Sequence, residues 1–189
     1  VLFFLFLLES IVNKIFIDGA VGTTGLEIRE RLLGRKDLEV LSISEESRKD
    51  TESRKRILNQ SDIVILCLPD EAAREAVSFI ENEETRVIDA STAHRTQNGW
   101  VYGFTECSEH QSELINTAKR VANPGCYAIG SISIIRPLLE AGVLPSDWPL
   151  SINAISGYSG GGKSLIQDFE EPKNIGASET NFFAYGLDL

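Results

Sequence analysis

The chain has 189 residues, of which 24% are charged and 42% hydrophobic, a composition typical of a folded globular protein. Its formal net charge of −10 argues against a nucleic-acid partner, because phosphate binding requires a basic face. The three cysteines are an odd number without a CxxC pair, so they predict neither a disulfide framework nor a metal site and fit a reducing, cytoplasmic setting.

The chain begins with eight apolar residues, too few to cross a membrane as a helix, which needs about 20. No basic segment precedes them, as one would in a signal peptide. We therefore expect residues 1–12 to be an extension outside the fold.

Short apolar runs then alternate with stretches of helical periodicity. We predict strands at residues 14–18, 38–44, 62–67 and 86–90, and helices at 26–33, 48–59 and 70–81, the last of them capped by Asp70. Strands and helices that alternate in this way form a parallel sheet. The sequence therefore predicts an α/β fold with a Rossmann-type domain over residues 13–122.

Past residue 91 the alternation is less regular. The pattern predicts a short strand or irregular segment at 100–104, a helix at 109–119, and a strand at 120–122, followed by a long apolar helix at 126–141 and a strand at 150–156. Too few residues follow residue 123 to complete a second sheet, so we expect the chain to be truncated.

A glycine-rich turn follows the first predicted strand. Gly19 suits a tight turn, Gly22 the close approach of a pyrophosphate, and Gly25 close packing of helix on strand. Thr23 or Thr24 is placed to cap the following helix, whose N-terminus would hold the phosphate. The context predicts a dinucleotide site, the alternative being a plain strand–helix turn.

The end of the second predicted strand favours NADP over NAD. NAD sites usually place Asp or Glu there, on the ribose diol. This chain has Ser44, with Arg48 close behind, and a hydroxyl with a guanidinium suits a 2′-phosphate better. Glu45 and Glu46 weigh against this interpretation, and the alternative is that Ser44 caps a turn and Arg48 is a solvated charge.

A cysteine, Cys126, stands at the start of the long apolar helix, behind Asn-Pro-Gly. A helix N-terminus favours the thiolate, which is the nucleophile. Cys67 at a strand end and Cys107 in a polar loop lack this placement, and we expect both to be unreactive. A structural role for Cys126 is the alternative, but together with a dinucleotide site it predicts oxidation or reduction of an aldehyde through a thioacyl enzyme.

Residues 89–95 follow the fourth predicted strand, at the sheet edge where ligands bind in open α/β folds. Ser91 and Arg95 are candidates for holding an anionic substrate group, since Arg binds phosphate or carboxylate through two donors. His94 is placed to assist. The alternative is a capped loop with a surface arginine.

A second glycine-rich loop spans residues 156–163, and residues 157–164 match the Walker A pattern literally. A P-loop follows the first strand of a nucleotide-binding sheet, whereas this loop comes after a complete Rossmann unit. We predict instead a flexible backbone loop near the cofactor and the thiol.

Taken in order, residues 14–25, 89–95, 123–127 and 156–163 resemble the short type of the N-acetyl-γ-glutamyl-phosphate reductase family. The resemblance covers about residues 13–189 and implies that residues 123–189 begin an α+β catalytic and dimerisation domain. It further implies NADPH-dependent reduction of N-acetyl-γ-glutamyl phosphate to N-acetylglutamate 5-semialdehyde and phosphate, in arginine biosynthesis, by a cytoplasmic homo-oligomer.

The resemblance also implies roles for single residues. Cys126 would attack the acyl phosphate and form a thioester. The resemblance implies that Ser91, Arg95 and Lys163 contact the substrate. It implies that Ser159 and Gly160 contact the cofactor.

One part of the family pattern is not present. The acid–base histidine of the family belongs to a later His-rich motif, while the histidines of this chain are His94 and His110, the second of which we expect to be solvated. We therefore expect this chain by itself to be weakly active or inactive. The alternatives are an aspartate-semialdehyde dehydrogenase, which the loop at 156–163 disfavours, a dinucleotide-binding module without catalysis, and a cysteine hydrolase.

Overall fold

The structure, a computed structural model, describes residues 12–170. The chain divides between Ala154 and Ile155 into two compact units, each described here by itself. The predicted domain boundary after residue 122 falls inside the first unit and stays a prediction. The predicted N-terminal extension lies outside the described residues except for Val12.

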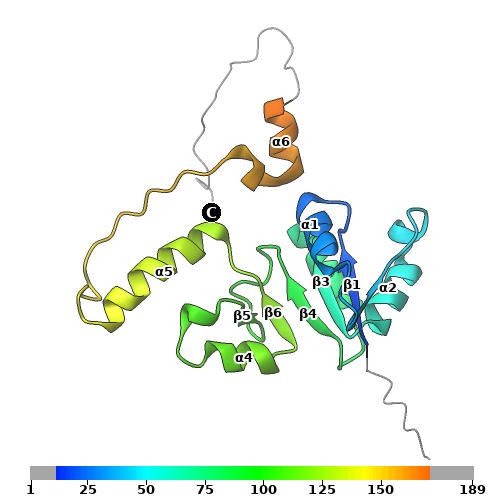
Figure 1. Cartoon of the computed structure of the whole chain (residues 1–189), viewed down its shortest axis with the longest axis horizontal. Coiled ribbons are helices and arrows are strands. Elements are labelled where there is room, and N and C mark those ends of the chain that lie inside the picture. Colours follow the sequence, from blue (N-terminus) through cyan, green and yellow to red (C-terminus); the bar gives the residue numbers. More distant parts are fainter. Residues whose placement is uncertain (1–11, 171–189) are drawn as a thin grey trace, which may run out of the picture. The chain divides into compact units, whose positions relative to one another are not determined.

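The first unit is built on a six-stranded parallel sheet in the order β2-β1-β3-β4-β6-β5 (Figure 1). The chain leaves β1 for β2 and then crosses to β3 on the other side of β1, which creates the switch point where such sheets bind ligands. The predicted Rossmann-type sheet is confirmed. Its strands are β1 (Asn13–Asp18), β2 (Leu38–Leu41), β3 (Ile63–Leu66), β4 (Arg86–Asp89), β5 (Val101–Tyr102) and β6 (Arg120–Ala122).

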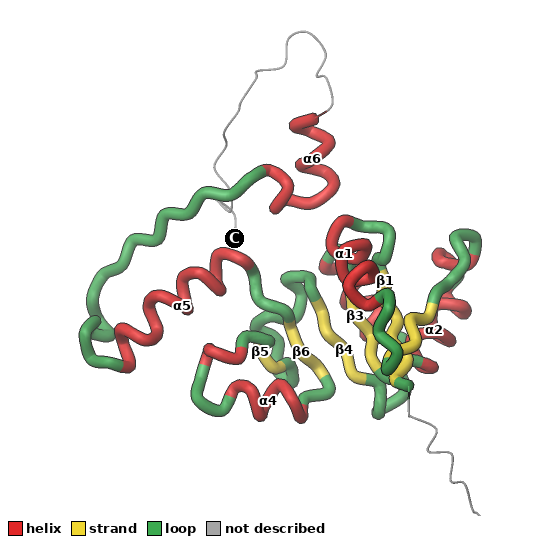
Figure 2. Tube along the Cα trace, in the orientation of Figure 1, coloured by secondary structure: helices red, strands yellow, loops and turns green. Residues whose placement is uncertain are grey.

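Helices alternate with the first four strands, as Figure 2 shows by colour. No helix among residues 12–170 is long and apolar enough to span a membrane. The helices of the first unit are α1 (Thr23–Leu32), α2 (Thr51–Gln60), α3 (Asp70–Ser78), α4 (Gln111–Thr117) and α5 (Cys126–Glu140), with single 3-10 turns η1 (Ser47–Lys49) and η2 (Thr105–Cys107). The second unit holds η3 (Tyr158–Gly161) and α6 (Gly162–Glu170).

A core cluster lies on one face of the sheet, between the strands and two helices. Pairing places Phe16 beside Val64, and Val64 beside Val87, so these side chains share that face. Leu58 of α2 and Ala73 of α3 pack on them, and all five are at most 2% exposed. Burying each large apolar side chain contributes about 1.5–3 kcal/mol, and this packing fixes the strand ends that carry the site.

Three local predictions were wrong. Residues 150–156 form no strand and are exposed, because no neighbouring strand within residues 12–170 accepts their backbone hydrogen bonds. The N-cap of α1 is Gly22 without a side-chain cap, since Thr23 already belongs to the first helical turn. Asp70 is the first residue of α3 rather than its cap, and its carboxylate accepts hydrogen bonds from the backbone and hydroxyl of Thr92 instead.

Candidate active site

The glycine-rich turn folds tightly between β1, β3 and the start of α1. Gly19 has a φ of +88°, and a Cβ there would overlap the carbonyl of Cys67. A Cβ at Gly25 would overlap the Gly19 carbonyl and lie 2.7 Å from the Ala20 Cα. At Gly22 a Cβ would make only an ordinary contact, so the fold does not itself demand glycine there, as expected where a ligand approaches the backbone.

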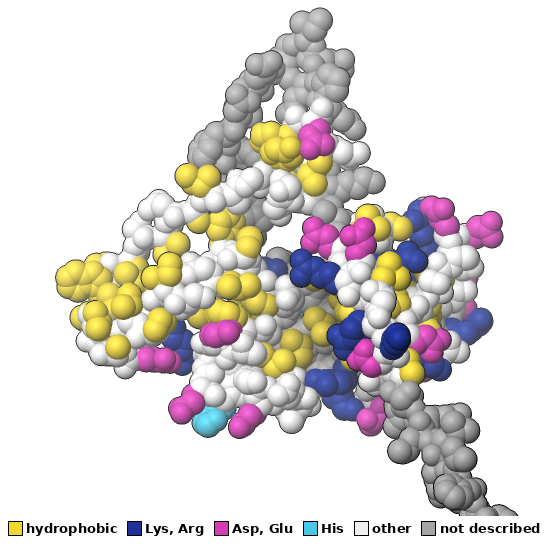
Figure 3. Space-filling view, in the orientation of Figure 1, with side chains coloured by type: hydrophobic (Ala, Val, Ile, Leu, Met, Phe, Trp, Pro, Cys, Tyr) yellow, Lys and Arg dark blue, Asp and Glu magenta, His cyan; other side chains and the backbone are white. Residues whose placement is uncertain are grey.

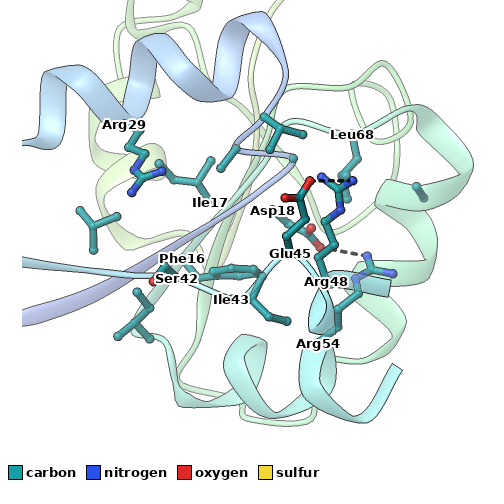
Figure 4. Close-up of a pocket in the computed structure, with 16 residues that line it drawn as sticks. Phe16, Ile17, Asp18, Arg29, Ser42, Ile43, Glu45, Arg48, Arg54 and Leu68 are labelled. Atoms are coloured by element: carbon teal, nitrogen blue, oxygen red, sulfur yellow. Dashed lines mark hydrogen bonds and ion pairs between the residues drawn. The ribbon is translucent and has the colours of Figure 1, made fainter. Parts of the chain in front are cut away.

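A cavity of about 580 Å³ opens beside this turn at the carboxyl ends of β1 and β2 (Figure 4). Three guanidinium groups line it, from Arg29 on α1, Arg48 on η1 and Arg54 on α2. The N-terminus of α1 stands at the same turn, so its backbone N–H groups and positive charge lie together there, which suits the phosphates of a dinucleotide.

The predicted cofactor residues do not all lie at this cavity. Arg48 lines it and pairs with Glu45 at 3.5 Å. Ser44 does not line it, because its hydroxyl accepts the Ser47 N–H at 3.2 Å and donates to the Ser47 hydroxyl. Ser44 thus caps a turn in this structure, the alternative that its sequence context left open.

Two of the arginines at the cavity were not among the predicted site residues. Arg29 lies four residues after Gly25 on α1, and residues at that spacing share a helix face, so helical periodicity was a usable signal. No comparable local pattern indicates Arg54, whose partner Asp18 is 36 residues away in the chain.

Cys126 is the first residue of α5, as predicted. Gly125 is the N-cap, and the thiol side chain is exposed. The first turn of α5 closes with a hydrogen bond from the Ile129 N–H to the Gly125 carbonyl. Cys126 therefore stands at the positive end of a four-turn helix.

A buried network fixes the loop that follows β4. Asp89 is fully buried, and its carboxylate accepts hydrogen bonds from the Ser91 backbone at 3.0 Å and the Ser91 hydroxyl at 2.6 Å. The Nδ1 of His94 lies 2.6 Å from the same carboxylate, and the imidazole stacks on Trp100 with ring centroids 4.1 Å apart. Ser91 and His94 are 8% and 6% exposed, so both side chains hold the loop in place. The predicted substrate contact of Ser91 stays a prediction.

This loop delivers Arg95 to the segment that precedes Cys126. Its Nε donates to the Asn123 carbonyl at 3.1 Å, and a Cβ built on Gly125 would lie 2.9 Å from its Nη1. The Asn123 N–H in turn donates to the Asp89 carbonyl at 2.7 Å. The structure therefore brings Arg95 next to the start of α5, a juxtaposition that connects two of the predicted site segments.

The two remaining cysteines and the second histidine lie in other surroundings. Burial, together with the smaller effect of the nearby carboxylates of Asp89 and Asp18, raises the pKa of the Cys67 thiol to about 11. Cys107 ends η2 and is half-buried. The His110 side chain is 77% exposed, as predicted.

The Cys67 pKa gives a prediction for the pH dependence of reactivity and stability. At pH 8 we expect iodoacetamide to modify Cys126 and leave Cys67 unmodified in the native protein, with peptide mass mapping as the measurement. Because the folded-state pKa lies above the ordinary value of 9.0, this thiol stabilises the fold below pH 9, and that contribution is lost as the pH rises toward 11. Unfolding of Cys67→Ala should lack this part of the pH dependence. Equal alkylation rates for Cys67 and Cys126 would contradict the prediction.

The second unit contains the second glycine-rich loop. Ser159 and Gly160 lie in η3, and Lys163 lies in the first turn of α6. The ring of Tyr158 stacks on Phe169 at 4.9 Å and its hydroxyl donates to Glu170 at 2.9 Å, which closes the loop back on the helix. The predicted contacts of this loop with cofactor and substrate stay predictions.

Two family models match the chain. One is described as the semialdehyde dehydrogenase NAD binding domain and matches residues 14–115. The other is described as the semialdehyde dehydrogenase dimerisation domain and matches residues 126–188. The first match covers β1 to β5 and the glycine-rich turn, and the second begins at Cys126.

Curated relatives are similar over most of this chain. N-acetyl-gamma-glutamyl-phosphate reductases from Chelativorans sp. (strain BNC1) and Mesorhizobium japonicum are 58% and 55% identical over 93% of it. The enzyme of the same name from Brucella ovis is 54% identical over 93%. The aligned part is only 56–57% of the length of these relatives, so the chain spans little more than half of such a protein.

Solved structures with the same fold are more distant in sequence. Aspartate semialdehyde dehydrogenase from Francisella tularensis aligns with a TM-score of 0.59 at 16% identity, over 83% of this chain and 48% of that chain. Aspartate semialdehyde dehydrogenase II from Vibrio cholerae gives a TM-score of 0.55 at 19% identity, over 83% and 50%. At such identities the likeness concerns the fold alone.

Proposed function

This chain belongs to the semialdehyde dehydrogenase family, and from that premise we propose that its protein reduces N-acetyl-γ-glutamyl phosphate to N-acetylglutamate 5-semialdehyde and phosphate. The observation that carries the proposal is the exposed thiol of Cys126 at the N-terminus of α5, with Arg95 against the segment before it. The substrate is that of the N-acetyl-gamma-glutamyl-phosphate reductases to which the chain is 54–58% identical.

The thiol supplies the covalent step. The Cys126 thiolate attacks the carbonyl carbon of the acyl phosphate, an S–C bond forms, and the C–O bond to phosphate breaks, so phosphate leaves and a thioester remains. When bound, the nicotinamide cofactor supplies the hydride that reduces this thioester. Release of the aldehyde breaks the S–C bond and restores the thiolate.

The surrounding groups of the chain support that step electrostatically. The N–H groups of the first turn of α5 stabilise the oxyanion that develops on the attacked carbonyl. Arg95 donates to the carbonyls of Asn123 and Ala90, and a guanidinium has five N–H donors in all. The donors left over are available to an oxygen of the leaving phosphate, beside the carbon that Cys126 attacks.

We further propose NADP as the cofactor. The family identifies a nicotinamide dinucleotide, and Arg48 at the cavity beside β2 supports the 2′-phosphate form. In this proposal Gly19, Gly22 and Gly25 give the diphosphate access to the N–H groups at the start of α1. The proposal keeps Ser159 and Gly160 as cofactor-binding residues and Lys163 as a substrate-binding residue.

The protein is proposed to act as a homo-oligomer in the cytoplasm. The match to a dimerisation domain supports the homo-oligomer. The large apolar side chains that α5 leaves exposed support it as well. Figure 3 shows hydrophobic side chains gathered along that helix, and the exposed ones on it include Ile134, Leu138 and Leu139.

The test is a steady-state assay of the protein at its natural length. NADPH oxidation should require N-acetyl-γ-glutamyl phosphate, and kcat/KM should be at least about 100-fold lower with β-aspartyl phosphate, because a site built for one substrate leaves its polar groups unpaired with another. NADPH should be preferred to NADH. A preference for β-aspartyl phosphate would favour the aspartate-semialdehyde dehydrogenase alternative. Cofactor binding without turnover of either acyl phosphate would favour the binding module.

A further inference from the structure

A carboxylate occupies an electrostatically unfavourable position at the dinucleotide cavity. Asp18 is the last residue of β1, directly before Gly19, and it lines the cavity. Its side chain is only 13% exposed, so water screens its charge poorly. An anionic diphosphate that approaches the glycine-rich turn would be repelled by this carboxylate unless a cation offsets the charge.

The cation is Arg54 of α2. Its Nη2 lies 2.9 Å from Oδ2 of Asp18, and its Nη1 lies 3.0 Å from Oε2 of Glu75 on α3. The guanidinium also lies 5.7 Å from the centre of the Phe79 ring. Figure 4 shows Arg54 reaching up to the end of β1 at the edge of the cavity. The group is therefore held by the end of β1 on one side and by α3 and its C-cap on the other, and it is 14% exposed.

The guanidinium of Arg54 stays protonated in these surroundings. Burial lowers the pKa of the guanidinium, but the hydrogen bonds and ion pairs with Asp18 and Glu75 outweigh this, and its pKa lies above the ordinary value. The guanidinium of Arg54 and the carboxylate of Asp18 together form a pair without net charge. The second carboxylate, on Glu75, is 55% exposed and is therefore largely screened at the cavity.

We propose that Arg54 is the charge-compensating residue of the dinucleotide site: it neutralises Asp18 so that the diphosphate can reach the glycine-rich turn. Arg54 acts on the cofactor through Asp18 and is a positioning residue, not a phosphate ligand. The inference rests on the dinucleotide site of the proposed function, but it does not depend on which acyl phosphate is reduced. It extends the set of predicted cofactor residues, in which neither Asp18 nor Arg54 was included.

The test compares ligands of different charge on the natural-length protein without substrate. Binding of NADPH, ADP and adenosine is measured for the wild type, Arg54→Gln, Asp18→Asn and the double variant. Arg54→Gln should weaken NADPH and ADP at least tenfold, which corresponds to about 1.4 kcal/mol, and adenosine less than twofold. In the double variant NADPH affinity should return to within about threefold of Asp18→Asn, since the poorly screened carboxylate of Asp18 is absent and Glu75 is largely screened by water.

Two further variants control for folding and for the general loss of an arginine. Arg35→Gln removes the same group from the exposed pair with Asp37, and its NADPH affinity should equal that of the wild type. Arg54→Lys keeps the positive charge and should restore most of the affinity that Arg54→Gln loses, which keeps the test informative if the glutamine variant does not fold.

Two results would overturn the proposal. If the double variant binds NADPH as weakly as Arg54→Gln, Arg54 contacts the phosphates directly. If Arg54→Gln weakens adenosine as much as NADPH, the effect is a structural collapse of the cavity and not a matter of charge. Both results come from binding measurements without substrate. They can therefore be distinguished from the finding that the protein does not reduce N-acetyl-γ-glutamyl phosphate.

Discussion

Cys126→Ser should lower kcat/KM for the acyl phosphate by about 10³-fold or more while NADPH binding stays within twofold of the wild type. Serine keeps the size and the position at the start of α5, but its hydroxyl is almost entirely protonated at neutral pH and forms an ester where the thiol forms a thioester. The measurements are NADPH oxidation in the steady state and cofactor binding by fluorescence, both on the natural-length protein.

The matched control is Cys107→Ser, which changes a half-buried cysteine outside the site. Its kcat/KM should stay within about twofold of the wild type, the range of ordinary surface substitutions. Mass spectrometry of the wild type with substrate and without cofactor should find the acyl group on the peptide that contains Cys126. Acylation of a different residue, or normal turnover by Cys126→Ser, would refute the nucleophile assignment.

Gly19→Ala should lower the free energy of unfolding by more than about 3 kcal/mol and abolish NADPH binding. Two effects add at this position. The φ of +88° is one that an L side chain rarely adopts. The new Cβ would also overlap the carbonyl of Cys67, a backbone group directly after β3 that cannot move away without shifting the strand. Urea unfolding and a fluorescence titration with NADPH measure the two losses.

Gly34→Ala separates these two effects. Gly34 has nearly the same dihedral, φ +92°, but nothing lies within 4 Å of a Cβ there. The strain of the backbone alone should cost about 1 kcal/mol, and cofactor binding should be retained. If the two alanine variants lose the same stability, the close approach of Gly19 to Cys67 contributes nothing and the tight turn is not a requirement of the site.

Most helices and strands can be predicted from the local sequence, because the residues that favour each one lie within it. Within residues 14–18, Ile15, Phe16 and Ile17 form an apolar, β-prone run too short for a helix, which is typical of a strand buried on both faces of a parallel sheet. The prediction for 150–156 used the same signal and was wrong. An apolar run becomes a strand only when another strand accepts its hydrogen bonds, and that condition is not local.

The sequence by itself also placed Cys126 at a helix N-terminus and the glycine-rich turn between a strand and a helix. Each of these features is complete within a few consecutive residues, so spacing alone was sufficient to identify it. The roles predicted for the loop at residues 156–163 depend on contacts with other parts of the protein, and for that reason they stay predictions.

Only the tertiary structure decided how the site segments are joined and how their charges are offset. The carboxylate of Asp89 holds the loop that carries Arg95, and Arg95 reaches the carbonyl of Asn123, 28 residues further along the chain. Arg54 meets Asp18 across 36 residues of sequence. Such contacts exist because the carboxyl ends of parallel strands meet at one sheet edge, and no pattern within a single segment specifies which distant side chain will lie there.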